Sequence, residues 1–108
     1  MGQFDQLEKL SNDIGAKAGA SPEDSYTAKL ISQGVAKCAK KFGEEAVELA
    51  LASVGHDRRD ITNEAADVLY HFLVLLKAAG VAPDDVMAEL KRREGTGGLV
   101  EKASRKDG

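Results

Sequence analysis

Aromatic residues and cysteine are scarce in this chain. Of its 108 residues only 5% are aromatic, tryptophan is absent, and the single cysteine is Cys38. One cysteine cannot form an internal disulfide, and its place between alanine and lysine in an expected helix indicates a packing role. The core must be built from Leu, Val, Ile and especially Ala, which suits closely packed helices. Such a core buries little apolar area per residue, so we expect a homo-oligomer.

An excess of basic residues is also missing. The 15 Lys and Arg against 18 Asp and Glu give a formal charge of −3, and no basic stripe with interleaved aromatics is present. Nucleic-acid binding is therefore not expected. The apolar positions of Phe4–Ile14 are interrupted by charges, unlike a signal peptide, and the longest apolar run, Phe72–Leu76, is too short to span a bilayer. We expect a cytoplasmic protein without a membrane partner.

No strand pattern appears, and the sequence predicts an all-α fold. A chain of this length fits one compact domain, here residues 1–96, with a loose tail over 97–108 after a run of glycines. Asp60 or Thr62 is expected to cap the fourth helix, and Pro83 to open the fifth. Apolar residues recur at helical spacing in five segments: Phe4–Ile14, a short helix from about Ala28 that Gly34 ends or bends, Val35–Val54, Asp60–Ala79, and Pro83 to Arg93.

The two long central helices each carry acidic residues three positions apart. Glu45 and Glu48 share one face of the first helix, with Glu44 on its flank, and Glu64 and Asp67 share a face of the second. The short connection predicts antiparallel packing, which lets the two pairs face each other. Crowded carboxylates repel unless cations lie between them, and hard oxygen ligands suit Mg²⁺ or Mn²⁺ rather than Zn²⁺.

Acids at helical spacing are also common on solvated surfaces. Two features favour a site here. The acids form matched pairs on consecutive helices, and these are the most apolar helices of the chain. The neighbouring apolar residues are expected to be buried: Leu49, Leu51, Val68 and Leu69.

The segments around these acids resemble a known group of enzymes. KFGEEAVEL from Lys41 and NEAADVLYH from Asn63 resemble the Glu-x-x-Glu then Glu-x-x-Asp signature of the all-α nucleoside-triphosphate pyrophosphatases (MazG-type). SYTAKL from Ser25, YHFLVLL from Tyr70 and AELKRREGT from Ala88 look like the phosphoribosyl-ATP pyrophosphatase family of histidine biosynthesis. The resemblance covers about Ser25 to Thr96.

This resemblance implies a helical bundle of that type, completed by dimerisation. It implies that Glu45, Glu48, Glu64 and Asp67 bind Mg²⁺, with Glu44 as a further ligand or an aid in positioning water. The implied reaction is hydrolysis of phosphoribosyl-ATP to phosphoribosyl-AMP and pyrophosphate, with Glu44, Glu45 and Glu48 as catalytic residues.

Six further side chains are candidates for supporting roles. Lys37 and Lys41 lie on the stripe of Glu45 and Glu48, although Lys41 can also simply pair with Glu45. Ser25 and Lys29 are candidates to contact phosphate or ribose, although Ser25 can also simply cap a helix. Asn63 lies four residues before Asp67 and His71 four residues after it. A supporting role behind the acids is plausible for both, but a packed, hydrogen-bonded core histidine is the favoured interpretation of His71.

Two other functions stay open. One is a housecleaning nucleotide pyrophosphatase that uses the same metal site on other triphosphates, since the acid pairs cannot separate these substrates. The other is a non-catalytic helical dimerisation module, against which the cost of burying unpaired carboxylates argues.

Overall fold

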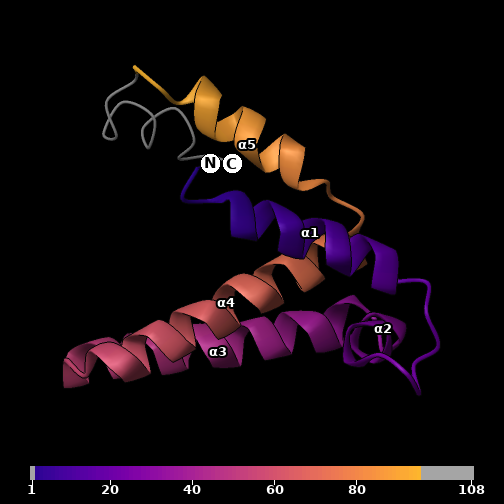
Figure 1. Cartoon of the computed structure of the whole chain (residues 1–108), viewed down its shortest axis with the longest axis horizontal. Helices are drawn as coiled ribbons and strands as arrows, with labels where there is room; N and C mark the ends of the chain where they lie inside the picture. The colour runs from indigo at the N-terminus through magenta and orange to yellow at the C-terminus, as the bar shows by residue number, and fades with distance from the viewer. Residues whose placement is uncertain (1, 96–108) are drawn as a thin grey trace.

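The computed structural model describes residues 2–95, and within this range the chain forms five helices and no strand. The helices are α1 (Asp5–Lys17), α2 (Tyr26–Ser32), α3 (Val35–Gly55), α4 (Arg58–Ala79) and α5 (Pro83–Arg92). Helices α3 and α4 form a long antiparallel hairpin, α1 lies against the C-terminal half of α4, and α2 lies beside the start of α3 (Figure 1). The predicted all-α fold is confirmed. The tail expected over 97–108 lies outside the described residues.

Local signals explain where the two long helices begin and end. Gly34 separates α2 from α3 with a φ of +96°, which an L side chain rarely adopts. Helix α3 ends at Gly55, and His56 reverses the chain with a φ of +64°. The side chain of Asp57 then accepts hydrogen bonds from the amides of Arg59 and Asp60 and caps α4.

The cap predicted for the fourth helix was wrong. Neither Asp60 nor Thr62 caps α4, because Asp57 already satisfies the free amides of its first turn. Helix α1 runs through Gly15 to Lys17, since an isolated glycine costs a helix only about 1 kcal/mol. Pro83 does open α5, as predicted.

The core lies where α1 and α2 meet the start of α3 and the C-terminal half of α4. Ile14, Leu30, Cys38, Leu73 and Val74 are buried together there. The thiol of Cys38 donates a hydrogen bond to the Leu30 carbonyl at 3.3 Å, and burial raises its pKa. The expected packing role of Cys38 is confirmed.

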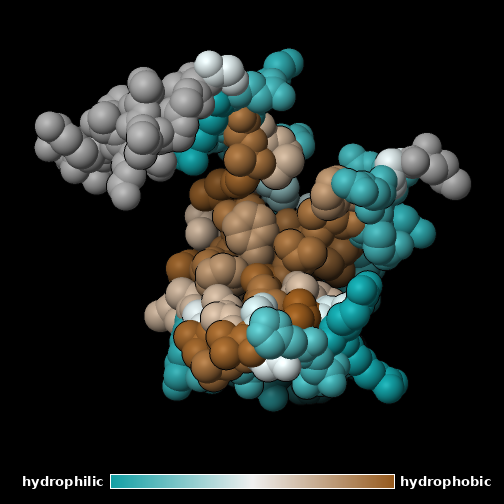
Figure 2. All heavy atoms as spheres, turned by 90° about the vertical axis from the view of Figure 1, so that its left-hand side faces the viewer, coloured by the Kyte–Doolittle hydropathy of each residue, from teal (hydrophilic) through white to brown (hydrophobic). Residues whose placement is uncertain are grey.

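The other end of the hairpin has no such cover. Leu51 is 67% exposed and Leu69 is 44% exposed, so the expectation that both are buried is wrong for the single chain. The reason is that α1 and α2 cover only one end of the α3–α4 pair. Seen from the side of the α3–α4 turn, apolar residues gather across the middle of the surface (Figure 2).

Helix α5 leaves α4 through a sharp bend. The two axes meet at 105°, and none of the residues of α5 is buried. Within residues 2–95 no single helix is long and apolar enough to cross a bilayer; only the bent pair α4–α5 reaches that length and composition.

Candidate metal centre

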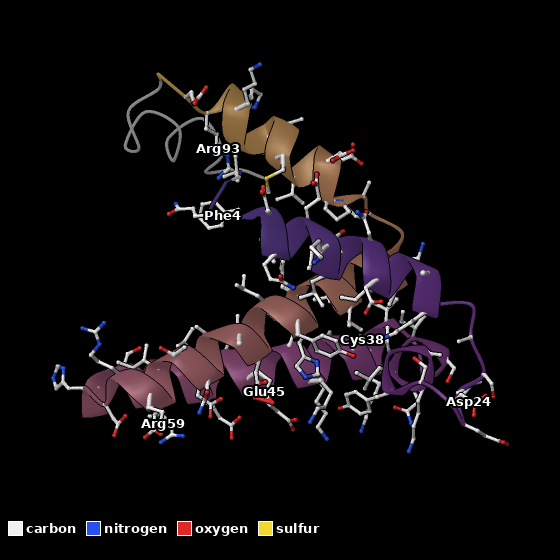
Figure 3. All side chains as sticks on the ribbon, in the orientation of Figure 1. Phe4, Asp24, Cys38, Glu45, Arg59 and Arg93 are labelled. Atoms are coloured by element: carbon white, nitrogen blue, oxygen red, sulfur yellow. The ribbon has the colours of Figure 1, made fainter. Side chains whose placement is uncertain are left out.

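The acid pairs of the two long helices meet at the middle of the hairpin. One carboxylate oxygen from each of Glu45, Glu48 and Glu64 lies within 4.8 Å of the other two. Glu45 and Glu48 come from adjacent turns of α3, and Glu64 projects from the second turn of α4. Figure 3 shows Glu45 near the middle of α3, beside α4. The structure thus brings together three of the four acids expected to bind metal.

The fourth acid, Asp67, lies outside this tight group of three. Its charge still helps to raise the pKa values of both Glu45 and Glu64. Its side chain is exposed and one methylene shorter than that of glutamate, so it reaches less far. Asp67 therefore borders the acidic cluster, by which we mean Glu45, Glu48 and Glu64.

Crowding changes the acid–base behaviour of the cluster. A hydrogen bond with Glu48, which forms once a proton is present, is the largest cause that raises the pKa of Glu45 to about 7; burial and the neighbouring carboxylates add to it. Burial is the largest cause that raises the pKa of Glu64, followed by the charges of Glu48 and Asp67. Without a cation, the folded protein therefore holds a proton at this site more tightly than free glutamate does.

The cluster also contains polar atoms that the protein leaves unsatisfied. The Oε2 atoms of Glu45 and Glu64 are buried and have no hydrogen-bond partner among residues 2–95. Buried polar atoms are normally paired, because an unpaired one costs about 1–3 kcal/mol. Several carboxylate oxygens around one point form the hard donor set that Mg²⁺ or Mn²⁺ prefers. The residues present fit a divalent cation.

An open groove of about 790 Å³ runs along α3 beside the cluster. Its lining includes Glu44, Glu45 and Glu48 together with Lys41. A smaller cavity of about 320 Å³ between α1 and the α4–α5 turn is lined by no acidic residue. The groove on α3 combines three acids with the positive charge of Lys41, as phosphate chemistry needs.

Lys41 lies on this groove but pairs differently from the expectation. Its ammonium contacts the Glu44 carboxylate at 3.5 Å, so the nearer partner is three residues away and not Glu45. The phenol of Tyr26 and then Glu44 are the largest causes that raise the pKa of Lys41. Lys41 therefore stays protonated at neutral pH beside the acidic cluster.

The other candidate residues have fewer contacts. The hydroxyl of Ser25 accepts a hydrogen bond from the Ala28 amide at 3.1 Å and so caps α2. Three exposed side chains form no hydrogen bond or ion pair within the described part of the chain: Lys29, Lys37 and Asn63. Lys29 and Ser25 line an open groove beside α2.

His71 is only 6% exposed, so the expected core packing is confirmed. The expected hydrogen bond is not, because its Nδ1 atom is buried without a partner in residues 2–95. Burial is the main cause that lowers its pKa, with Lys41 acting in the same direction and the charges of Asp67 and Glu44 opposing it. A neutral histidine therefore lies within electrostatic range of the groove.

A pair of nearly parallel tyrosine rings, one on α2 and one on α4, was not identified from the sequence. The rings of Tyr26 and Tyr70 lie nearly parallel, with centroids 6.4 Å apart. The Tyr70 hydroxyl is hydrogen-bonded to the hydroxyl of buried Thr27 at 2.5 Å. Both tyrosines lie in segments that resemble the family, and this was the available signal. Their contact could not be predicted because they lie far apart in the sequence, in α2 and α4.

Comparison with known proteins extends these observations. Residues 7–94 match the family model described as phosphoribosyl-ATP pyrophosphohydrolase. A phosphoribosyl-ATP pyrophosphatase of Dinoroseobacter shibae is 57% identical over 92% of this chain and 97% of its own length. The proteins of the same name from Cereibacter sphaeroides and Methylobacterium radiotolerans are each 56% identical. The alignment with the first covers 92% of this chain and 96% of the relative, and the alignment with the second covers 93% and 94%.

Proposed function

This chain belongs to the phosphoribosyl-ATP pyrophosphohydrolase family, and from that premise we propose how its residues carry out the reaction. The protein is a hydrolase that converts phosphoribosyl-ATP to phosphoribosyl-AMP and pyrophosphate in histidine biosynthesis. The bond that breaks joins the α- and β-phosphates. The observation that supports the proposed site most strongly is the convergence of Glu45, Glu48 and Glu64 within 4.8 Å.

Mg²⁺, for which Mn²⁺ can substitute, would be held by the acidic cluster with Asp67 at its border. When bound, it supplies positive charge that neutralises the triphosphate and makes nearby water more acidic. The Oε2 atoms of Glu45 and Glu64, which have no hydrogen-bond partner within the described residues, are available as metal ligands and support this assignment. The raised pKa of Glu45 supports it too, because crowded carboxylates favour any added positive charge, whether a proton or a metal ion.

Lys41 and Glu44 would exchange partners when the substrate enters. Their contact of 3.5 Å is between half-exposed side chains, and such a surface pair contributes little to stability. A phosphate oxygen competes well for the ammonium because it carries more charge. Once Lys41 turns to the phosphate, the Glu44 carboxylate is released to orient a water and accept its proton as the oxygen attacks phosphorus.

The remaining candidate residues would bind the outer parts of the substrate. Lys37 follows the same face of α3 as Lys41 and would add a second cation for the phosphates. Ser25 can still donate its hydroxyl proton while it caps α2, and Lys29 lies on the same groove. Asn63 would contact the substrate from α4, and His71 would support the acids from behind.

The protein would act as a homodimer. Val47, Leu51 and Val54 form one stripe on α3, spaced four and three residues apart, and are 58%, 67% and 75% exposed. Exposed apolar stripes of this kind are usually covered by a partner, and a second copy of the same stripe would match it around a two-fold axis. Because the substrate is a highly charged metabolite, we place the enzyme in the cytoplasm.

The test is pyrophosphate release from phosphoribosyl-ATP and from a panel of ordinary nucleoside triphosphates, each with Mg²⁺, with Mn²⁺ and with EDTA. The proposal requires metal-dependent release with phosphoribosyl-ATP as the preferred substrate. Equal rates on ordinary triphosphates would indicate a general nucleotide pyrophosphatase. No release from any substrate would contradict an enzymatic role.

A further inference from the structure

Tyr26 is one of few exposed aromatic side chains in the molecule. The chain has three phenylalanines and two tyrosines, and of these only Phe4 and Tyr26 are exposed, at 68% and 55%. Phe4 precedes α1, whereas Tyr26 is the first residue of α2, the helix that lies beside the start of α3 (Figure 1). Leaving a large ring in water forgoes about 1.5–3 kcal/mol of burial, so a ring held open beside a substrate groove calls for an occupant.

The ring of Tyr26 has a second aromatic ring beside it. It lies 15° from parallel with the ring of Tyr70, which in turn meets the ring of His71 edge-on at 5.0 Å. The hydrogen bond between Tyr70 and buried Thr27 fixes that second ring in place. A flat side chain held by a fixed neighbouring ring loses little entropy when another flat group binds.

The position of Tyr26 connects the acidic cluster with the groove beside α2. Tyr26 is near enough to Lys41 for the charge of its ionised phenolate to raise the pKa of that lysine, and Lys41 contacts Glu44 on the groove that contains Glu45 and Glu48. Tyr26 also lines the open groove of about 590 Å³ with Ser25, Lys29 and the two acids Glu23 and Asp24. A nucleotide whose phosphates lie at the cluster and Lys41 can therefore extend its base over this ring.

We propose that Tyr26 is the platform on which the purine base of the substrate stacks. This inference rests on the proposed function, because it assumes a nucleotide whose phosphates bind at the acidic cluster. Stacking uses the face of the ring and not the hydroxyl, so phenylalanine or tryptophan can replace tyrosine. The platform holds the base equally before and during bond cleavage, so it acts on KM and leaves kcat nearly unchanged.

Steady-state kinetics on phosphoribosyl-ATP provide the first test. Removing a stacked base contact weakens binding by roughly 5- to 100-fold. We therefore expect Tyr26→Ala to raise KM by such a factor with kcat within about twofold. Tyr26→Phe should restore the KM, and Phe4→Ala is the matched control for loss of an exposed ring. An unchanged KM in Tyr26→Ala, a loss confined to kcat, or failure of Tyr26→Phe to restore KM would each overturn the platform.

Fluorescence gives a second test that does not depend on turnover. Because the chain has no tryptophan, Tyr26→Trp introduces a single reporter at the platform, and Phe4→Trp introduces one away from it. With Mg²⁺ present, AMP should quench the first reporter and not the second, and pyrophosphate alone should quench neither. No response to AMP in Tyr26→Trp, or the same response in both variants, would refute stacking. If the wild type fails to hydrolyse phosphoribosyl-ATP but AMP still quenches Tyr26→Trp, the proposed function fails and the purine platform stands.

Discussion

Replacing Glu48 by glutamine separates a metal ligand from a structural acid. The amide keeps the shape of the side chain but removes one negative charge from the acidic cluster. At the 4.8 Å limit that contains these oxygens, two unit charges in a water-like dielectric repel by about 0.9 kcal/mol. Without metal, Glu48→Gln should therefore be more stable than the wild type, with a melting temperature higher by about 3–7 °C for a domain of this size.

With metal the effect should reverse. At a free concentration one hundred times its Kd, Mg²⁺ stabilises a folded protein by about 2.7 kcal/mol, and a tenfold weaker site loses about 1.4 kcal/mol of that gain. The shift in melting temperature caused by Mg²⁺ should be correspondingly smaller in Glu48→Gln. Activity should fall by about 100-fold or more, because the charge that stabilises the leaving pyrophosphate is misplaced.

The assay is thermal melting in EDTA and in a Mg²⁺ series, with turnover of phosphoribosyl-ATP measured on the same preparations. Glu8→Gln, which makes the same change on the exposed surface of α1, is the control and should alter neither the Mg²⁺ response nor the turnover. A destabilised Glu48→Gln in EDTA would mean that Glu48 serves the fold. Near-native turnover would remove Glu48 from the catalytic site.

Three more predictions concern proton binding, assembly and the α4 cap. Because the pKa of Glu45 is raised to about 7, the metal-free folded state binds a proton that the unfolded chain has already released; its free energy of unfolding should decrease as the pH rises from 4.5 through 7. Urea unfolding in EDTA at several pH values measures this, and Glu45→Gln should flatten the dependence. Leu51→Glu places a charge on the exposed stripe of α3 and should yield a monomer in sedimentation, whereas a wild type that is already monomeric at micromolar concentration would contradict the dimer. Asp57→Ala removes the cap of α4 and should cost about 1 kcal/mol in chemical denaturation; no change would show that water replaces the cap.

The sequence predicted the fold well because its helix signals are local. Periodic apolar residues, the glycine at Gly34 and the proline at Pro83 depend only on neighbouring residues, and the structure bears out the helices they indicate. The cap of α4 was missed because Asp57 and Asp60 both fit the composition of a cap. Only the backbone geometry decides which of the two aspartates accepts hydrogen bonds from the free amides of the first turn.

The acidic cluster could be predicted because its residues are also close in the sequence, whereas other contacts of the site could not. Helical spacing within α3 places Glu45 beside Glu48, and the short turn to α4 brings Glu64 to them. The pairing of Lys41 with Glu44 depends on side-chain rotamers, which spacing does not determine. The stacked tyrosines join segments far apart in the chain, and the uncovered face of Leu51 depends on how far α1 and α2 extend.

Titration of the metal-free protein with Mg²⁺, read by pyrophosphate release from phosphoribosyl-ATP, tests whether the acidic cluster is the metal centre. We expect no release in EDTA, saturable recovery with Mg²⁺, and preference for phosphoribosyl-ATP over ATP. Glu45→Gln and Glu64→Gln should each shift the recovery to higher Mg²⁺ concentration or abolish it. Full activity in EDTA, or an unchanged Mg²⁺ dependence in both variants, would contradict the assignment of the acidic cluster as the metal centre.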